Sequence, residues 1–185
     1  MRELLEAVFF HAHVSRAKKI ARPVLEAATL WLESPSVLLS IWGQTAAGQV
    51  RASQVHSAFE KLPAERRSRA SEIEERTQSN DITIFNITSK EPTLELESSS
   101  LALQEFFVAQ ALCKGFTLPP EVAQPWQWHE WWMGTLKIGR DVGRDFERGL
   151  LKSSAQASTA AEQGLLLRSA IANHRPTAIL SLIHI

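Results

Sequence analysis

The sequence lacks several features that would place it in a specialised class of protein. It has one cysteine, Cys113, in 185 residues, which excludes an intramolecular disulfide and fits a reducing compartment. Its 20 basic and 20 acidic residues cancel, so no overall field draws the chain toward nucleic acid or an anionic membrane. No stretch approaches the roughly 20 apolar residues that span a bilayer, and no signal peptide is evident at the N-terminus. These absences predict a cytoplasmic protein with neither a nucleic-acid nor a membrane partner.

The patterns that catalysis and metal binding require are also missing. Residues 43 to 48 have the glycine spacing of a phosphate-binding loop, but Gln49 stands where a lysine must reach the phosphates and Val50 where a hydroxyl must hold magnesium. His11 and His13 are two positions apart and face different directions on a helix, so we expect packed histidines and no metal site. The sequence therefore predicts no enzymatic activity, and no cofactor or metal in this chain.

The hydrophobic pattern predicts a mainly helical protein. With 44% hydrophobic and 22% charged residues, the chain can build a core. Apolar residues recur at helical spacing in several segments. The expected helices cover residues 2 to 21, 24 to 32, 34 to 42, 49 to 62 and 63 to 78. The last of these is so polar that only Ala64, Ala70 and Ile73 can pack, which indicates a solvated helix or a linker.

From residue 82 the pattern changes to that of strands. Residues 82 to 88 are rich in β-branched side chains, and residues 93 to 97 alternate with period two after a turn that contains Pro92. This pattern predicts a β-hairpin. Three serines, 98 to 100, then precede the run 101 to 112, whose apolar side chains cover more than half of a helix surface. We therefore expect a helix that is buried in the core, with Phe106 on its inner face.

A family resemblance appears at the start of this helix. The motif residues are Leu101, Leu103, Gln104, Glu105 and Phe106. Their order resembles a motif of NACHT-type (STAND) signalling NTPases, in which it opens a helix of the winged-helix region behind the nucleotide-binding domain. The family's nucleotide-sensing histidine corresponds to Ser100 here, and its capping serine to Ala102. The resemblance covers residues 82 to 112 by motif and, more loosely, residues 1 to 152 by the order of elements.

The resemblance implies a role in signal transduction without catalysis. In such proteins this region packs on the nucleotide-binding domain in the closed state and swings away on activation, which couples nucleotide state to protein–protein assembly. The implied partner is a protein: the upstream nucleotide-binding domain of the same polypeptide, or other subunits. ATP binding would belong to that upstream domain, and the present chain would be a truncated fragment of the whole.

A tryptophan-rich segment leaves a second interpretation open. Its four indole side chains belong to Trp126, Trp128, Trp131 and Trp132. Indole rings anchor cores, and we expect Trp131 and Trp132 to pack inward with Leu136. The same four rings could instead form a partner surface, in which case the chain would be a free-standing helical protein-interaction module.

These segments predict a fold class and a division of the chain. We expect a mainly α protein, a helical bundle with one small β-hairpin in a winged-helix-like unit, followed by a tryptophan-rich helical segment. The expected parts are a helical region (1–78), the hairpin plus buried helix (79–114), the tryptophan-rich segment (115–152), a spacer leading to a further unit (153–179) and a terminal artefact (180–185). That last hexapeptide is what a transposase-type sequencing adapter encodes when it is read in frame.

Overall fold

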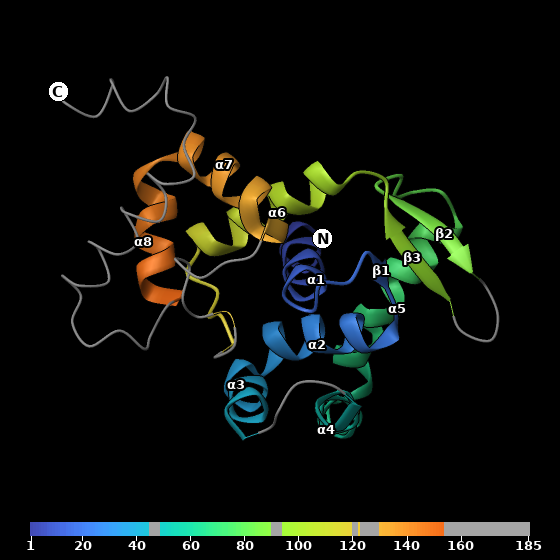
Figure 1. Ribbon diagram of the computed structural model, residues 1–185. Helices are drawn as coiled ribbons and strands as arrows, with labels where there is room; N and C mark the ends of the chain where they lie inside the picture. Colours follow the sequence, from blue (N-terminus) through green and yellow to red (C-terminus); the bar gives the residue numbers. More distant parts are fainter. Residues whose placement is uncertain (45–48, 90–93, 120–121, 123–129, 154–185) are drawn as a thin grey trace, which may run out of the picture. The chain divides into compact units, whose positions relative to one another are not determined.

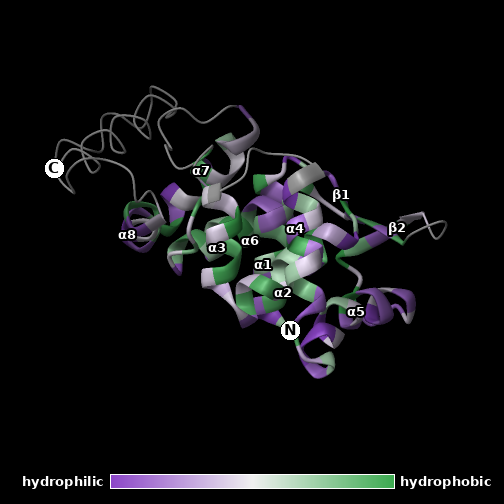
Figure 2. Cartoon of the chain, turned by 90° about the horizontal axis from the view of Figure 1, so that it is seen from below, coloured by the Kyte–Doolittle hydropathy of each residue, from purple (hydrophilic) through white to green (hydrophobic). Residues whose placement is uncertain are grey.

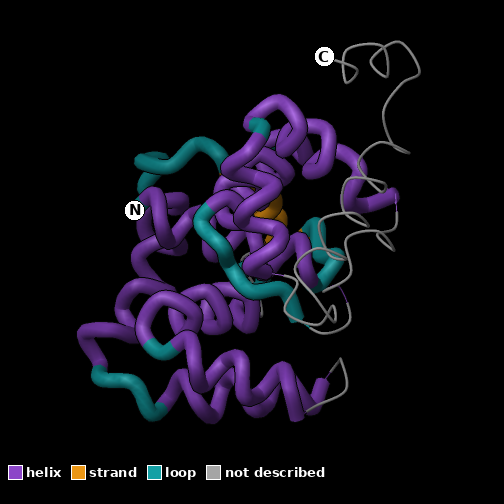
Figure 3. The backbone as a smooth tube through the Cα atoms, turned by 90° about the vertical axis from the view of Figure 1, so that its left-hand side faces the viewer, coloured by secondary structure: helices purple, strands orange, loops and turns teal. Residues whose placement is uncertain are grey.

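Helices dominate the computed structural model, which describes residues 1–44, 49–89, 94–119, 122 and 130–153 (Figure 1). In these residues the strands are a minor part of the backbone (Figure 3). The predicted fold class, mainly α with a small β unit, is therefore confirmed. The chain divides into two units, Met1–Val108 and Ala109–Ile185.

The first unit contains most of the elements. In chain order they are α1 (Arg2–Val14), β1 (Lys19–Ile20), α2 (Arg22–Glu33), α3 (Pro35–Gln44), α4 (Gln49–Glu60), α5 (Ala64–Gln78), β2 (Phe85–Ser89), β3 (Glu95–Ser98) and the first part of α6 (Leu101–Cys113). The helices expected up to residue 78 are present. The expected end of the first one is wrong, because α1 ends at Val14 and not near residue 21.

A three-stranded antiparallel sheet follows the order β1-β3-β2. The predicted hairpin is its β2–β3 pair, with Phe85 opposite Ser98. The third strand, β1, was not predicted: Ile20 pairs with Leu96 of β3. The chain reverses between α1 and β1 through Arg16, which has a left-handed backbone with φ 52°. A strand of two residues is too short to show period-two alternation in the sequence, so β1 forms only because it pairs with β3.

Helix α1 forms the centre of the first unit's core. It lies between α2 and the first half of α6 (Figure 1). Its side chains are buried almost all the way round from Leu4 to His13, including Phe9 and Phe10. Burial of one such phenyl ring contributes about 1.5 to 3 kcal/mol. The covering of α1 on opposite sides therefore buries both of its faces.

Helix α5 is polar over most of its surface and is correspondingly purple in Figure 2. Of its three apolar residues, Ala70 and Ile73 are buried as expected, whereas Ala64 is exposed. Ion pairs add to this small apolar contact. Glu33 at the end of α2 lies 3.3 Å from Arg66 and 3.1 Å from Arg69. The segment is thus a solvated helix fastened to α2 and not a linker.

The second unit contains the end of α6, a 3₁₀ turn (Glu130–Trp132), α7 (Met133–Val142) and α8 (Arg144–Ser153). Gly143, with φ 80°, forms the turn between α7 and α8. A Cβ atom on Gly149 of α8 would lie only 1.7 Å from the carbonyl oxygen of Leu112 in α6. The backbones of α8 and of this end of α6 are therefore in direct contact.

Candidate functional site

The turn before α6 is organised by serine hydroxyl groups. The Oγ atom of Ser98 donates to the carbonyl oxygen of Ser100 at 2.7 Å and accepts from the Ser100 amide at 3.3 Å. The amide of Ser99 donates to the carbonyl of Ile84 at 2.9 Å, which ties the turn to the strand region on the other side of the hairpin. The sheet therefore determines where α6 begins. Ser100, which the sequence resemblance aligned with a histidine, is exposed.

The structure places the five motif residues on different sides of α6. Gln104 is buried with 1% of its surface exposed, Leu103 and Glu105 are half-buried, and Leu101 and Phe106 are 44% and 41% exposed. The expectation of a buried helix with Phe106 on its inner face is therefore wrong for the first half of α6. Apolar side chains surround this helix, whereas α1 covers only one of its sides.

Aromatic stacking holds the inner face of α6 in place. The ring of Phe9 on α1 stacks on Phe107 of α6 at a centroid distance of 5.0 Å and on Phe85 of β2 at 5.1 Å. Such pairs contribute about 0.5 to 1.5 kcal/mol beyond the area that they bury. One fully buried phenyl ring thus connects the helix that carries the motif, the hairpin and the central helix.

Two histidines of α1 also lie in the core. Nδ1 of His13 lies 3.4 Å from the side-chain nitrogen of Gln104, and both side chains are buried. The ring of His11 lies among aromatic side chains, 5.3 Å from Trp42 and 6.0 Å from Trp31. Burial lowers the pKa of both imidazoles from 6.5 to about 3, so both are neutral at physiological pH. The expectation of packed histidines is confirmed.

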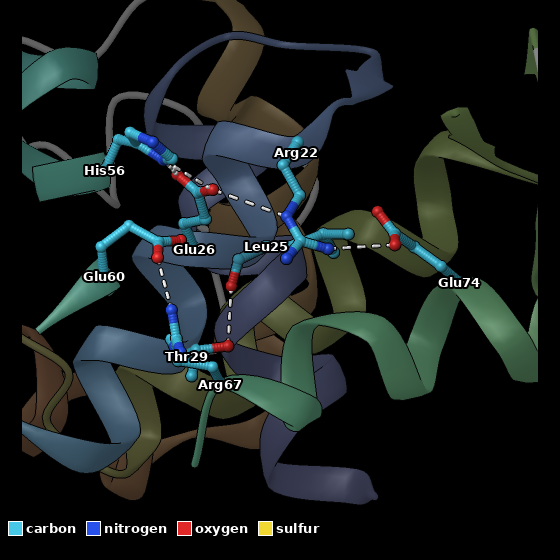
Figure 4. A network of polar contacts seen from close by, with 8 residues as sticks. All are labelled: Arg22, Leu25, Glu26, Thr29, His56, Glu60, Arg67 and Glu74. Atoms are coloured by element: carbon cyan, nitrogen blue, oxygen red, sulfur yellow. Dashed lines mark hydrogen bonds and ion pairs between the residues drawn. The ribbon is translucent and has the colours of Figure 1, made fainter. Parts of the chain in front are cut away.

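A charged network fastens three helices of the first unit to one another (Figure 4). Glu26 of α2 is almost fully buried and lies 3.1 Å from Nδ1 of His56 on α4. Arg22 approaches the same carboxylate at 3.5 Å and reaches Glu74 of α5 at 3.0 Å. The Arg22 guanidinium also lies 5.6 Å from the centroid of the Phe59 ring. Because this carboxylate and this guanidinium already have partners, the network is suited to positioning helices rather than to catalysis.

Two open hollows lie between the helices of this unit. One, of about 440 Å³, is bordered by α3 and α4 and is lined by serines together with Val37 and Lys61. The other, of about 260 Å³, is bordered by α2, α4 and α5, and its lining includes Arg22 and Arg67. These two arginines pair with Glu74 and Glu60, respectively. The second hollow is therefore lined by cations that are already neutralised.

The tryptophan-rich segment is described only in part. Trp126 and Trp128 lie outside the described residues. Trp132 is completely buried and Leu136 is buried, as expected for core anchors, whereas Trp131 is half-buried. Within the predicted tryptophan-rich helical segment, residues 130–132 form a 3₁₀ turn and α7 begins at Met133.

Three further features of the sequence concern phosphate binding, thiol reactivity and metal binding. The loop at residues 45–48 lies outside the described residues, as do the side chains of Gln49 and Val50. Burial, and then the Asp145 carboxylate, raise the pKa of the Cys113 thiol, so this thiol is less readily ionised than a free cysteine. In the described ranges, no cluster of three or more histidine, cysteine, aspartate or glutamate side chains could hold a metal ion.

Comparison with known proteins gives no relative: no family model, no curated protein and no solved structure matches the chain. Among the described helices, none has the length and apolar character needed to cross a bilayer.

Sequence reasoning missed the contacts that join distant segments. The bond between His13 and Gln104 links positions 91 residues apart, and the pair of Glu26 and His56 links positions 30 apart. The sequence around these residues does not indicate either contact; it shows at most a polar residue among apolar ones. For Gln104 that signal exists, since an amide surrounded by apolar positions requires a buried partner.

Proposed function

We propose that the chain is the winged-helix and following helical region of a NACHT-like signalling NTPase. In this role it is regulatory and non-catalytic, and it couples the nucleotide state of a neighbouring domain to protein–protein assembly. The element order of the first unit carries this proposal.

That order contains the elements of a winged helix together with two additional helices. In a winged-helix domain a helix and a short strand are followed by two helices and then by a hairpin, and the first strand pairs with the last. Here α1, β1, α2, α5, β2 and β3 follow one another in that sequence, with α3 and α4 inserted, and the strand order is β1-β3-β2. Since β1 was not anticipated from the sequence, it supports the resemblance independently of the motif.

A fold alone does not determine a function, because one fold serves many functions. The motif is the second support for the proposal. It lies on the helix that directly follows the hairpin. Gln104 and the neighbouring Phe107 face the core, whereas Leu101 and Phe106 remain exposed. An outward apolar face on an otherwise well-packed helix is suited to docking against another domain. This face would be the surface that contacts the nucleotide-binding domain in the closed state.

The genomic locus tests the proposal directly. Roughly 300 codons upstream of Met1 are enough for an NTPase domain, and we expect them to encode a phosphate loop with both its lysine and its hydroxyl residue. The assignment would be refuted by an in-frame stop codon close upstream of Met1 if no phosphate loop is encoded between that stop codon and Met1. The alternative, a free-standing interaction module, would then be favoured.

A binding measurement tests the proposed surface. The upstream domain, loaded with ADP, should bind the chain, and Phe106→Asp should weaken this binding by at least about tenfold if the ring is a central contact. Val37→Asp is the matched control, because Val37 is 42% exposed, much as Phe106 is, but belongs to α3 and not to α6. Equal losses in both variants would contradict the proposed surface. A loss on Trp131→Ala alone would support the module that binds through its tryptophans.

A further inference from the structure

A serine on α5 lies within a run of arginines. Arg66 and Arg67 directly precede Ser68 in the sequence, and Arg69 directly follows it. Ser68 is exposed, and its Oγ atom donates to the carbonyl oxygen of Glu65 at 2.6 Å. Its hydroxyl group is therefore at the surface and bonded to the backbone of its own helix.

Ser68 faces the hollow that is bordered by α2, α4 and α5. Ala64, Ser68 and Ser71 all line this hollow, and their spacing of four and three residues places them on one side of α5. The same lining includes Arg22 from α2 and Arg67 from α5. Two guanidinium groups therefore border the space that a group attached to Ser68 would enter.

We propose that Ser68 is a phosphorylation site and that its phosphoryl group binds in this hollow to Arg22 and Arg67. The modifying enzyme is a serine kinase whose substrate groove accepts arginine side chains. The Oγ atom of Ser68 attacks the γ-phosphorus of ATP, the bond from that phosphorus to the β,γ-bridging oxygen breaks, and ADP leaves. The hydroxyl proton passes to the catalytic base of the kinase. This inference goes beyond the proposed function and does not depend on it.

The first part of α5 can open, which gives a kinase the extended chain that it needs as substrate. The side chains of residues 64–69 are all exposed or half-buried, and the first buried residue of the helix is Ala70. Pro63, at the N-cap, makes no side-chain hydrogen bond to the helix. The ion pairs of this segment involve partly exposed arginines and contribute little to stability. A segment with so little burial opens at a lower cost than the whole protein does.

The two arginines can bind a phosphoryl group although each already pairs with a carboxylate (Figure 4). Arg67 pairs with Glu60, whose side chain is 47% exposed, and Arg22 lies 3.0 Å from Glu74. A phosphoserine carries a charge of about −1.5 to −2 at pH 7 and presents three strong acceptor oxygens, which is more than a carboxylate offers. A guanidinium group has several N–H donors and pairs with phosphate through two parallel bonds. The phosphoryl group therefore displaces Glu60 toward solvent and shares Arg22 with Glu74.

Binding of the phosphoryl group adds a contact between two helices. Arg22 belongs to α2, whereas Ser68 belongs to the part of α5 that has no buried side chain. Charge-assisted hydrogen bonds of this kind are stronger than neutral ones. The modification therefore fastens the first part of α5 to α2 and reduces its opening.

Amide hydrogen exchange in the full chain measures this opening, with phosphoserine incorporated at position 68 during translation. Exchange of residues 66–69 should be about tenfold slower in the modified chain than in the unmodified one. Arg67→Gln should abolish this difference. Arg69→Gln is the matched control, because Arg69 is the other neighbour of Ser68 but its guanidinium lies 3.1 Å from Glu33. The control should keep the difference, and comparison of both forms of each variant cancels the effect of the substitution itself.

Phosphorus NMR of the modified chain gives a second measurement at the same group. The second pKa of phosphoserine is ordinarily about 6, and neighbouring guanidinium groups should lower it because they favour the dianion. Arg22→Gln should raise this pKa toward its ordinary value. A pKa that is not lowered, an exchange rate that modification leaves unchanged, or equal effects of Arg67→Gln and Arg69→Gln would overturn the binding of the phosphoryl group in the hollow.

A kinase reaction tests the site itself. The full chain is incubated with Mg-ATP and a purified serine kinase that prefers arginine next to its target, and the product is mapped by mass spectrometry. Ser68 should be phosphorylated, Ser68→Ala should remove this product, and Ser71→Ala should keep it. No incorporation, or incorporation at Ser71 in place of Ser68, would overturn the assignment of the site.

Discussion

Replacement of Gly149 by alanine tests the closest backbone contact in the second unit. A Cβ atom at this position would lie 1.7 Å from the carbonyl oxygen of Leu112, 2.6 Å from its carbonyl carbon and 2.8 Å from Cα of Cys113. Ordinary contact begins at 3.4 Å, so the oxygen and the new methyl group must separate by about 1.7 Å. All three atoms belong to the backbone, so no side-chain rotation relieves the clash.

The expected cost combines two opposing effects. Alanine is better than glycine in a helix interior by about 0.5 to 1 kcal/mol. Overpacking costs about 1 to 3 kcal/mol when side chains can adjust, and more when backbones must separate. We therefore expect Gly149→Ala to lower the free energy of unfolding by about 2 to 3 kcal/mol.

The assay is urea denaturation of the full chain, followed by far-ultraviolet circular dichroism. Gly43→Ala is the matched control, because a Cβ atom on Gly43 in helix α3 would meet no neighbouring group within 4 Å in the described part of the chain. Gly43→Ala should leave the free energy of unfolding unchanged or raise it by up to about 1 kcal/mol. If Gly149→Ala proved as stable as the unmodified chain, the close approach of α8 to α6 would be wrong.

Further predictions concern the first unit and the sequence motif. Phe9→Ala should cost about 3 to 5 kcal/mol in urea denaturation, and Phe106→Ala less than about 1.5 kcal/mol, because the first ring is buried and stacked whereas the second is 41% exposed; equal costs would contradict these environments. Glu33→Gln should cost about 1 kcal/mol or less in the free energy of unfolding, and the loss should be smaller in 1 M salt, since its two arginine partners are about half exposed; a loss that salt leaves unchanged would contradict a screened ion pair. His11 has a pKa of about 3 in the folded protein and 6.5 in the unfolded chain, so its burial should lower the free energy of unfolding by about 2 kcal/mol between neutral pH and pH 5. His11→Phe should remove this pH-dependent loss, which thermal melts at both pH values can measure. Calorimetric titration with Mg-ATP should show no binding, since Gln49 replaces the lysine of a phosphate loop; micromolar affinity would refute that expectation.

The elements with a strong local pattern were predictable. The hairpin follows from β-branched residues and period-two alternation, and the polar character of α5 follows from its composition. The two-residue strand β1 was not predictable, because its pairing depends on β3, which lies more than seventy positions further along the chain. Its existence is a property of the tertiary structure.

Exposure on α6 shows a second limit of periodicity. Apolar side chains at 101, 103, 106, 107 and 108 surround the helix, so their spacing could not decide which side would be covered. The covered side depends on α1, whose Phe9 and His13 meet Phe107 and Gln104. For the same reason, the order of residues 101 to 106 could not indicate which of them would be buried and which exposed.

The continuity of α6 has a practical consequence for work with fragments. This helix runs from Leu101 to Cys113, and the division between the two units falls inside it, after Val108. Cleavage there would leave two short helical pieces, each with new unpaired amides or carbonyls, and pieces of that length are marginal in water. A recombinant version of either unit should therefore include the whole of α6, and a protease site inserted to separate them belongs outside residues 101–113.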